Sequence, residues 1–320
     1  MALVFHDGRF IPEAHIQKNT EASKALRLLR SFLDKNEPGL VRFLLNTWNS
    51  QGNAITYKEL REAILNGDLD PKLLEEWMQD YSRFVVKYLH PQWEEAMIVA
   101  NTALEAKHPA WYYNPMAEGV RSWVDTRAAE FVTNVTTTQI EALRAVVQRA
   151  AVLEDMSVDE LSRAIRPMIG LTKPQATANM NYYEKLRASG VSPKQAREKS
   201  LRYAARQHRQ RAYTVARTEL ASAYNQGAYE GTKQAQAAGL IGAVVKVWCT
   251  ADDERVCSIC GSLEGVEVAM DDDFNGASRS WSTRRTAPAH PGCRCAIIYN
   301  EISAPEKIQG RQSKIQNLVV

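Results

Sequence analysis

The sequence predicts an α+β protein that is predominantly helical and carries a small β-containing module toward its C-terminal end. From about Glu21 to Leu240, apolar residues recur at three- and four-residue steps broken by brief turns, which is typical of amphipathic helices. From Ala243 onward, short runs rich in β-branched residues replace that spacing. All five cysteines lie beyond this change, so the final module is expected to differ from the helices in chemistry as well as in fold.

The composition of the 320-residue chain is that of an ordinary globular protein, with 45% hydrophobic and 24% charged residues. Its formal net charge of +3 does not by itself indicate a nucleic-acid partner, since local clustering of Lys and Arg decides that question. No apolar run approaches the roughly 20 residues of a bilayer span, and the first residues lack the pattern of a secretory signal. We therefore expect no membrane partner and a reducing cytoplasm, where clustered cysteines bind metal more often than they form disulfides.

Apolar spacing and capping signals predict the individual helices. In residues 70–89, the apolar side chains form one predicted stripe, made up of Leu74, Trp77, Tyr81, Phe84 and Tyr88. Helix starts are predicted where a capping residue precedes a good first turn, at Thr56 with Glu59, Asp70 with Pro71, Ser157 with Glu160 and Ser192 with Pro193.

The chain is expected to divide into four parts. Residues 1–115 form a helical N-terminal region, which ends in a connector rich in proline and aromatic residues. Residues 116–240 form a helical middle with a long basic helix, residues 241–302 a Cys/His β module, and residues 303–320 a tail. Three segments predict the strands of the module, namely "AVVKVWCTA", "GVEVAM" and "RCAIIYNEI".

The cysteine pattern of the module predicts a structural zinc site. Cys257 and Cys260 are spaced so that both thiolates reach one ion from a tight turn, and His290, Cys293 and Cys295 supply a second group of ligands. A tetrahedral Zn²⁺ takes four ligands, so the sequence leaves open which two of the last three complete the site. Cys249, between apolar neighbours, is expected to be a buried strand thiol instead.

Catalysis is the alternative interpretation of the same residues. Cys293 with His290 resembles a thiol nucleophile with its base, and Asp252, Asp253 and Glu254 supply carboxylates, as in a metal-dependent hydrolase or nuclease. A nucleophile requires one activated thiol, whereas this chain has a group of them. The sequence therefore favours a protein that is not an enzyme.

A positive stretch precedes the module. Residues 194–211 carry seven cations and the single acid Glu198. A surface of this kind contacts DNA phosphate or an acidic protein, or is simply a solvated helix face. The candidates for a DNA or partner contact are Arg202, Arg206, Arg209 and Arg211.

From about Ala150 to Tyr299 the sequence resembles the phage Mu protein F-like minor head protein family. The resemblance rests on an Arg-Thr-Glu triplet in a helix, a strand ending in Trp, an Asp-x-Arg-x-Cys-x-x-Cys segment and a final His-Pro-x-Cys-Arg-Cys. Besides the cysteines and His290, the matching positions are Arg217, Thr218, Glu219, Trp248, Asp252, Arg255, Gly265 and Arg294.

The resemblance implies a head morphogenesis protein of a tailed phage or prophage. Such a protein would be made in the host cytoplasm and reside in the virion as a minor capsid component at the portal vertex. Its expected partners are the portal protein, other capsid or scaffold proteins and double-stranded DNA, during procapsid assembly and DNA packaging or delivery. We further expect Glu219 to form a buried ion pair with Arg294 or Arg255, locking the helix to the module.

Overall fold

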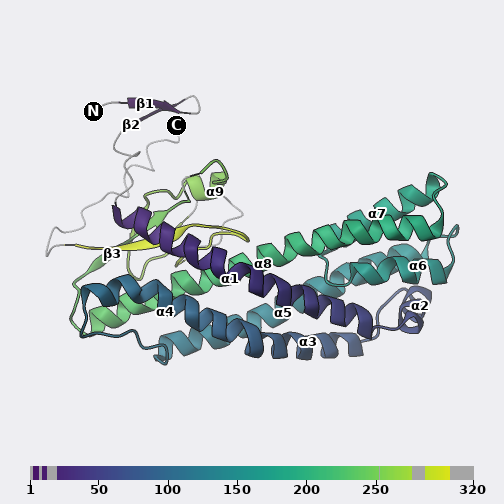
Figure 1. Ribbon diagram of the computed structural model, residues 1–320, viewed down its shortest axis with the longest axis horizontal. Coiled ribbons are helices and arrows are strands. Elements are labelled where there is room, and N and C mark those ends of the chain that lie inside the picture. Colours follow the sequence, from purple (N-terminus) through teal and green to yellow (C-terminus); the bar gives the residue numbers. More distant parts are fainter. Residues whose placement is uncertain (1–2, 7–8, 13–19, 252, 276–284, 303–320) are drawn as a thin grey trace. The chain divides into compact units, whose positions relative to one another are not determined.

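The computed structural model describes residues 3–6, 9–12, 20–251, 253–275 and 285–302, which are mainly helical (Figure 1). The chain divides into a helical unit, residues 33–95 and 116–220, and a sheet unit, residues 1–32, 96–115 and 221–320. Three helices contribute residues to both units, namely α1 (Thr20–Ala54), α4 (His90–Lys107) and α8 (Pro193–Ala237). A mainly helical chain with a small sheet near its C-terminal end is thereby confirmed, whereas the boundaries at residues 115, 240 and 302 stay predictions.

The helical unit is built around α5 (Glu118–Ala151), which packs against its neighbours α2, α3 and α7 (Figure 1). Its other elements are α2 (Tyr57–Asn66), α3 (Lys72–Phe84), the π turn η2 (Val85–Leu89), α6 (Val158–Ile165), η3 (Arg166–Met168) and α7 (Lys173–Ala188). The capping box predicted at Thr56 and Glu59 is confirmed, because each residue bonds the backbone N–H of the other. Ser157 likewise accepts a hydrogen bond from the backbone N–H of Glu160.

The predicted stripe of α3 is confirmed at Trp77, Tyr81 and Phe84, which are all buried. Leu74 was wrongly included, since 40% of this residue is exposed. Leu73, one turn before Trp77, is buried in its place. The reason is helical geometry: positions 73, 77, 81 and 84 follow steps of four and three residues and stay on one face.

Polar side chains are buried among these apolar ones without being left unpaired. The hydroxyl of Tyr81 donates to Gln139 Oε1 and accepts a hydrogen bond of 3.0 Å from Trp48 Nε1. Gln139 Nε2 in turn donates to Gln51 Oε1 at 3.0 Å. A buried polar group without a partner costs about 1–3 kcal/mol, so this closed set avoids that penalty and fixes the mutual register of three helices.

The described residues of the sheet unit form two antiparallel sheets. A hairpin pairs β1 (Leu3–His6) with β2 (Arg9–Pro12). In the second sheet, β3 (Val244–Cys249) lies between β4 (Glu267–Ala269) and β5 (Ala296–Glu301) and is antiparallel to both. The three strands predicted for the C-terminal module are confirmed by this sheet. The short helix α9 (Ser258–Gly261) follows β3 in the chain (Figure 1).

The two faces of β3 serve different purposes. Val247 and Cys249 lie on one face and pack against Ala22 and its neighbours at the start of α1. Trp248 lies on the opposite face, in a buried core cluster that also contains five aromatic or aliphatic side chains and three cysteines. The predicted buried strand thiol at Cys249 is confirmed, since the residue is only 3% exposed.

The C-terminal part of α8 holds the edge of this sheet. Asn225 accepts a hydrogen bond from the backbone N–H of Ile297 at 3.0 Å and donates to the carbonyl of Cys295 at 3.2 Å. One asparagine side chain thus pairs with a backbone N–H of β5 and with the carbonyl just before β5, as the backbone of a neighbouring strand would. Within the described ranges, no helix combines the length and apolar character needed to cross a membrane.

Candidate metal centre

The Cys/His cluster, defined as Cys257, Cys260, His290, Cys293 and Cys295, forms on the Trp248 face of the sheet unit. Cys257 and Cys260 come from one tight turn. Cys257 precedes α9, and its sulfur accepts a hydrogen bond from the backbone N–H of Cys260 at 3.4 Å. The N–H of Gly261 closes the turn on the carbonyl of Cys257 at 2.8 Å. Both thiols therefore start from one rigid backbone segment.

His290 and Cys293 come from a second tight turn. The backbone N–H of Cys293 donates to the carbonyl of His290 at 3.1 Å, and Gly292 has φ +76°, a conformation that favours glycine. His290 Nδ1 lies 3.0 Å from the carbonyl of Pro291, so this nitrogen is the donor in the neutral ring. The other nitrogen, Nε2, is then free to act as a ligand.

The two turns meet at short distances. His290 Nε2 lies 3.1 Å from the sulfur of Cys257 and 3.2 Å from that of Cys260. The sulfur of Cys260 also lies 3.6 Å from that of Cys293. Two groups of three ligand atoms result, one with Cys257, Cys260 and His290 and one with Cys260, Cys293 and Cys295, and the atoms within each group lie within 4.8 Å of one another. These residues could hold a metal ion, with Cys260 common to both groups.

The surroundings shift the pKa values of the cluster cysteines in opposite directions. They favour the thiolate, the form of cysteine that binds metal, at Cys257 and Cys293, whereas hydrogen bonds with Cys293 and Cys295, together with burial, raise the pKa of Cys260, and the pKa of Cys295 is also raised. Burial raises the pKa of the Cys257 thiol, but hydrogen bonds from Cys260 outweigh it, so the pKa is lowered. Hydrogen bonds from Cys260 and Cys295 lower the pKa of Cys293 further still. Burial lowers the pKa of His290, but the Pro291 carbonyl and the charges of Cys293 and Cys257 raise it overall.

Arg294 ties the two turns together from outside the cluster. Its guanidinium donates two hydrogen bonds to the carboxylate of Asp253, at 2.5 and 2.6 Å. Asp253 also accepts hydrogen bonds from the backbone and side chain of Arg255. These contacts, led by the bond from Arg294, lower the pKa of Asp253. Because Asp253 lies just before the first turn and Arg294 just after the second, the ion pair closes the cluster.

Asp253 is a residue that the sequence motif should have identified. The predicted motif position was Asp252, which lies outside the described residues. In the spacing Asp-x-Arg-x-Cys, with Cys257 as the cysteine and Arg255 as the arginine, the aspartate is Asp253. The sequence alone therefore identifies this position. Asp253 supplies the carboxylate that binds Arg294.

Two other motif positions support the same part of the fold. Trp248 is fully buried and packs edge-to-face on Phe274, with 5.2 Å between ring centres. Gly265 has φ +70° and donates its N–H to the carbonyl of Trp248 at 2.9 Å. This left-handed position turns the chain from α9 into β4, which explains why glycine suits it.

The predicted ion pair of Glu219 with Arg294 or Arg255 is wrong. Both oxygens of Glu219 accept hydrogen bonds from Arg127 in the helical unit, at 2.7 and 3.0 Å, while Arg294 and Arg255 bind Asp253. The physical reason is that Glu219 is only 5% exposed, and Arg127 is the cation that reaches it.

The other two residues of the Arg-Thr-Glu triplet also have partners in the helical unit. Arg217 binds both oxygens of Glu37, at 2.7 and 2.8 Å, and the Thr218 hydroxyl donates to the carbonyl of Thr214 at 2.6 Å. The triplet therefore connects α8 to α1 and, through Glu219, to α5.

The four arginines predicted to contact DNA or a partner do not share one surface. Arg202, Arg206 and Arg209 are exposed. Arg211 was wrongly included among the candidate contact residues, because it is only 7% exposed. It donates to the carbonyl of Gly170 and lies over the ring of Trp48. Its position two residues after Arg209 turns it toward the helical core rather than the solvent.

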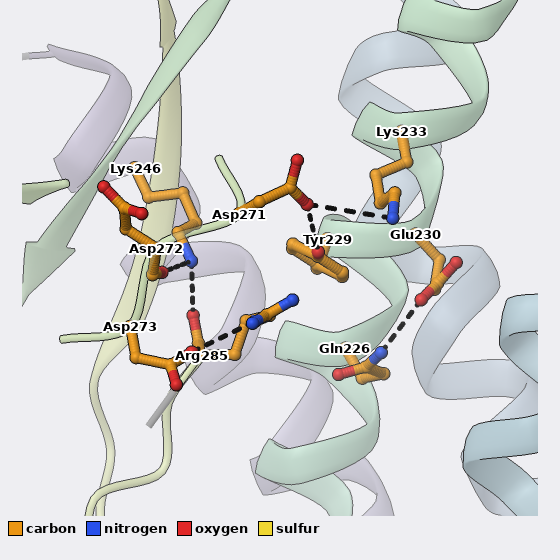
Figure 2. A network of polar contacts seen from close by, with 9 residues as sticks. All are labelled: Gln226, Tyr229, Glu230, Lys233, Lys246, Asp271, Asp272, Asp273 and Arg285. Atoms are coloured by element: carbon orange, nitrogen blue, oxygen red, sulfur yellow. Dashed lines mark hydrogen bonds and ion pairs between the residues drawn. The ribbon is translucent and has the colours of Figure 1, made fainter. Parts of the chain in front are cut away.

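A second polar network of the sheet unit, centred on Lys246, was not predicted from the sequence. Lys246, in the middle of β3, is fully buried and donates to the carbonyls of Asp272 at 2.6 Å and Arg285 at 2.9 Å (Figure 2). Its ammonium group also lies over the rings of Tyr229 and Phe274, at 5.5 and 5.3 Å from their centres. Burial lowers the pKa of Lys246 to about 8.

Carboxylates around Lys246 are bound by other cations. Asp273 accepts a hydrogen bond from Arg285 at 3.0 Å, and Asp271 lies 3.8 Å from Lys233 (Figure 2). Phe274 contacts both Lys246 and Trp248, so it lies between this network and the Cys/His cluster. Residues 272–274 therefore contact β3 at two positions, Lys246 and Trp248.

Comparison with known proteins identifies the region that contains the cluster. No curated protein and no solved structure matches the chain. Residues 149–298 match the family model described as Phage Mu protein F like protein. The match includes the Arg-Thr-Glu triplet, the strands β3 and β4, and the whole Cys/His cluster. Over residues 149–298, slightly less than half of its length, the chain is therefore similar to the phage Mu protein F-like family, a similarity that suggests a phage head morphogenesis protein.

Proposed function

We propose that the protein is a minor capsid component that joins the phage head at the portal vertex and acts in procapsid assembly and DNA packaging or delivery. The family match over residues 149–298 is the observation that carries this proposal. The contacts of the motif residues agree with a structural role. Trp248, Gly265 and Arg294 hold turns and strands in place, and Arg217 and Glu219 join helices.

The Cys/His cluster is proposed to hold one Zn²⁺ ion that stabilises the sheet unit. The donor set fits zinc, which prefers thiolate and imidazole ligands in tetrahedral structural sites. The two turns are far apart in the sequence, so an ion bound by both would cross-link residues 257–260 to residues 290–295. Bound there, the ion supplies a cross-link rather than a reaction.

Packaged DNA is proposed as a further partner, through the exposed face of α8. Lys199, Arg202, Arg206 and Arg209 recur at steps of three and four residues and therefore lie along one face, about 15 Å long at 1.5 Å per residue. Among the described residues none of the four pairs with a carboxylate. A row of unneutralised cations suits the phosphate backbone and requires no base sequence.

Incorporation into heads tests the portal proposal. Heads would be purified from cells that express the head genes with or without the portal gene, and the protein would be measured by mass spectrometry. We expect its presence in heads with the portal and its loss from heads assembled without it. Equal amounts in both preparations would contradict a location at the portal vertex.

Salt dependence tests the DNA proposal. A duplex of random sequence should bind with an affinity that falls steeply with salt, by a slope of about 0.9 per phosphate contact. Replacing Arg202, Arg206 and Arg209 with glutamine should reduce that slope by about 2 to 3. A matched control with three exposed cations of the helical unit, Lys72, Lys87 and Arg163, replaced by glutamine should leave it nearly unchanged. Equal losses in both variants would refute a specific surface on α8.

A metal-dependent hydrolase or nuclease predicts a different result for His290. Such an enzyme would cleave duplex DNA or cell-wall polymer, and His290→Ala would abolish turnover while the fold survives. The structural proposal expects no turnover in the parent protein and a loosened sheet unit in the variant. Measuring both cleavage and thermal unfolding of the two proteins therefore separates these functions.

A further inference from the structure

We propose that Tyr203 is a positioning residue of the DNA surface on α8, where its ring holds the guanidinium of Arg206 in place for a phosphate of duplex DNA. Tyr182 of α7 in turn holds the ring of Tyr203. This inference rests on the proposed DNA contact through the exposed row of cations on α8. It adds aromatic side chains that the charge pattern alone does not identify.

The contact between Tyr203 and Arg206 is the first observation. The two residues are three positions apart on α8, and residues at this spacing are neighbours on the surface of a helix. The guanidinium carbon of Arg206 lies 5.8 Å from the centre of the Tyr203 ring, within the distance of about 6 Å over which a cation and a ring attract each other. Tyr203 is half-buried, whereas Arg206 is exposed. Arg206 is thus held over a ring and still reaches the solvent.

The ring of Tyr203 is itself fixed by α7. Tyr182 packs against it edge-on, with 5.4 Å between the ring centres, a separation typical of aromatic pairs. The buried Asn179 of α7 donates to the carbonyl of Ser200 at 3.3 Å and to Gln207 Oε1 at 3.1 Å. These bonds join the two helices on both sides of Tyr203 in the sequence. The ring therefore belongs to the packing of α7 against α8 and is not a free surface side chain.

Arg206 keeps its hydrogen-bond donors available. Among the residues that the structure describes, neither a carboxylate nor a carbonyl accepts a hydrogen bond from Arg206. Two other arginines of the helical unit also lie over rings, Arg166 over Tyr57 and Arg211 over Trp48, but both donate to backbone carbonyls. Their guanidinium groups are already bound within the fold, whereas that of Arg206 is held and unoccupied.

A guanidinium held in this way suits a phosphate. When it stacks on a ring, its N–H edge stays free, and this edge can bind a phosphate through two parallel hydrogen bonds. A flexible arginine loses side-chain entropy when it binds, and ordering the side chain beforehand reduces that cost. Contacts with phosphate do not read the base sequence. Tyr203 should therefore raise the affinity for any duplex without adding a charge of its own.

Binding of a random-sequence duplex at several salt concentrations tests the inference on the full-length protein. Tyr203→Leu removes the ring but no charge. It should weaken binding about 2- to 5-fold and leave the salt slope unchanged, whereas Arg206→Gln should reduce the slope by about 0.9. Tyr203→Phe keeps the ring and should bind like the parent. In a protein that already carries Arg206→Gln, Tyr203→Leu should have no further effect, because the ring then has no cation to hold.

The matched control is Tyr57→Leu, which removes a ring from beneath Arg166 and should leave the affinity unchanged. Four results would overturn the role of Tyr203: parental affinity in Tyr203→Leu, the same loss with and without Arg206→Gln, an equal loss in Tyr203→Phe, or an equal loss in Tyr57→Leu. The second result would also reveal a variant that is simply misfolded. A parent protein that does not bind the duplex, or binds it equally at all salt concentrations, would instead overturn the DNA contact itself.

Discussion

The helical unit and the sheet unit are stabilised in different ways. The helical unit buries long apolar stripes, and its buried carboxylates are paired within it, Glu219 with Arg127 and Glu37 with Arg217. The larger sheet of the sheet unit consists of three strands of six, three and six residues, and three cysteines belong to the core cluster on its Trp248 face. A small sheet buries little apolar surface, so an added cross-link contributes more there. With the proposed ion bound, the sheet unit would depend on metal for its stability, whereas the helical unit would not.

The largest expected effect is the loss of Cys260, which belongs to both ligand groups. Cys260→Ala should remove the cross-link and destabilise the sheet unit by 5 kcal/mol or more, about half of the usual free energy of binding of a structural zinc. Unfolding followed by amide hydrogen exchange in β3 and β5 measures it. Cys249→Ala, a buried thiol on the other face of β3, is the matched control and should cost about 1 kcal/mol. Equal losses would indicate packing rather than metal binding.

The next effect lies in the helical unit. Arg127→Met leaves the buried carboxylate of Glu219 without its partner, which should cost about 3–5 kcal/mol in chemical denaturation. Adding Glu219→Gln should recover a large part of that loss, because the uncompensated charge is removed. Neither value should depend on a metal chelator. A chelator-dependent loss would show that the two units do not differ as described.

Much of this organisation could be predicted from the sequence. The apolar spacing located the helices, and β-branched runs located all three strands of the C-terminal sheet. The cysteine spacing brought the five cluster residues together correctly. These features are local, so a short window of sequence contains them.

The failures concern partners that are far apart in the chain. Glu219 binds Arg127, 92 residues away, and many arginines could have served equally well from the sequence. Arg211 has the same composition around it as Arg209, and only the packing of Trp48 and Gly170 buries it. Lys246 stands in an apolar strand with no local feature that reveals the two carbonyls it bonds.

The buried amine of Lys246 gives the sheet unit its own pH dependence. Its pKa is lowered from 10.5 to about 8 in the folded protein, so the unfolded chain binds more protons between these values. The free energy of unfolding should therefore rise with pH through this window, by up to about 3 kcal/mol. Lys246→Met should lack this rise when both proteins are denatured at pH 7.5, 9 and 10. A parallel pH dependence in the variant would assign it to other groups.

The smallest effect concerns the ion pair that closes the cluster. The Arg294 guanidinium lowers the pKa of Asp253, so its stabilisation is complete above about pH 4 and is lost as the pH falls. Asp253→Asn should cost about 1–2 kcal/mol at pH 7, and the gap to the parent should shrink between pH 5 and 3. Glu254→Gln, the neighbouring carboxylate, serves as the control. A gap that stays constant down to pH 3 would exclude the ion pair as its cause.

Amide hydrogen exchange with and without a metal chelator tests the central claim most directly. The two units can be compared in a single protein, peptide by peptide. If a metal ion cross-links the Cys/His cluster, the chelator should raise exchange strongly in β3, α9 and β5 and leave α2, α3 and α5 unchanged. Unchanged protection of β3 and β5, or an equal loss in both units, would contradict a metal-stabilised sheet unit.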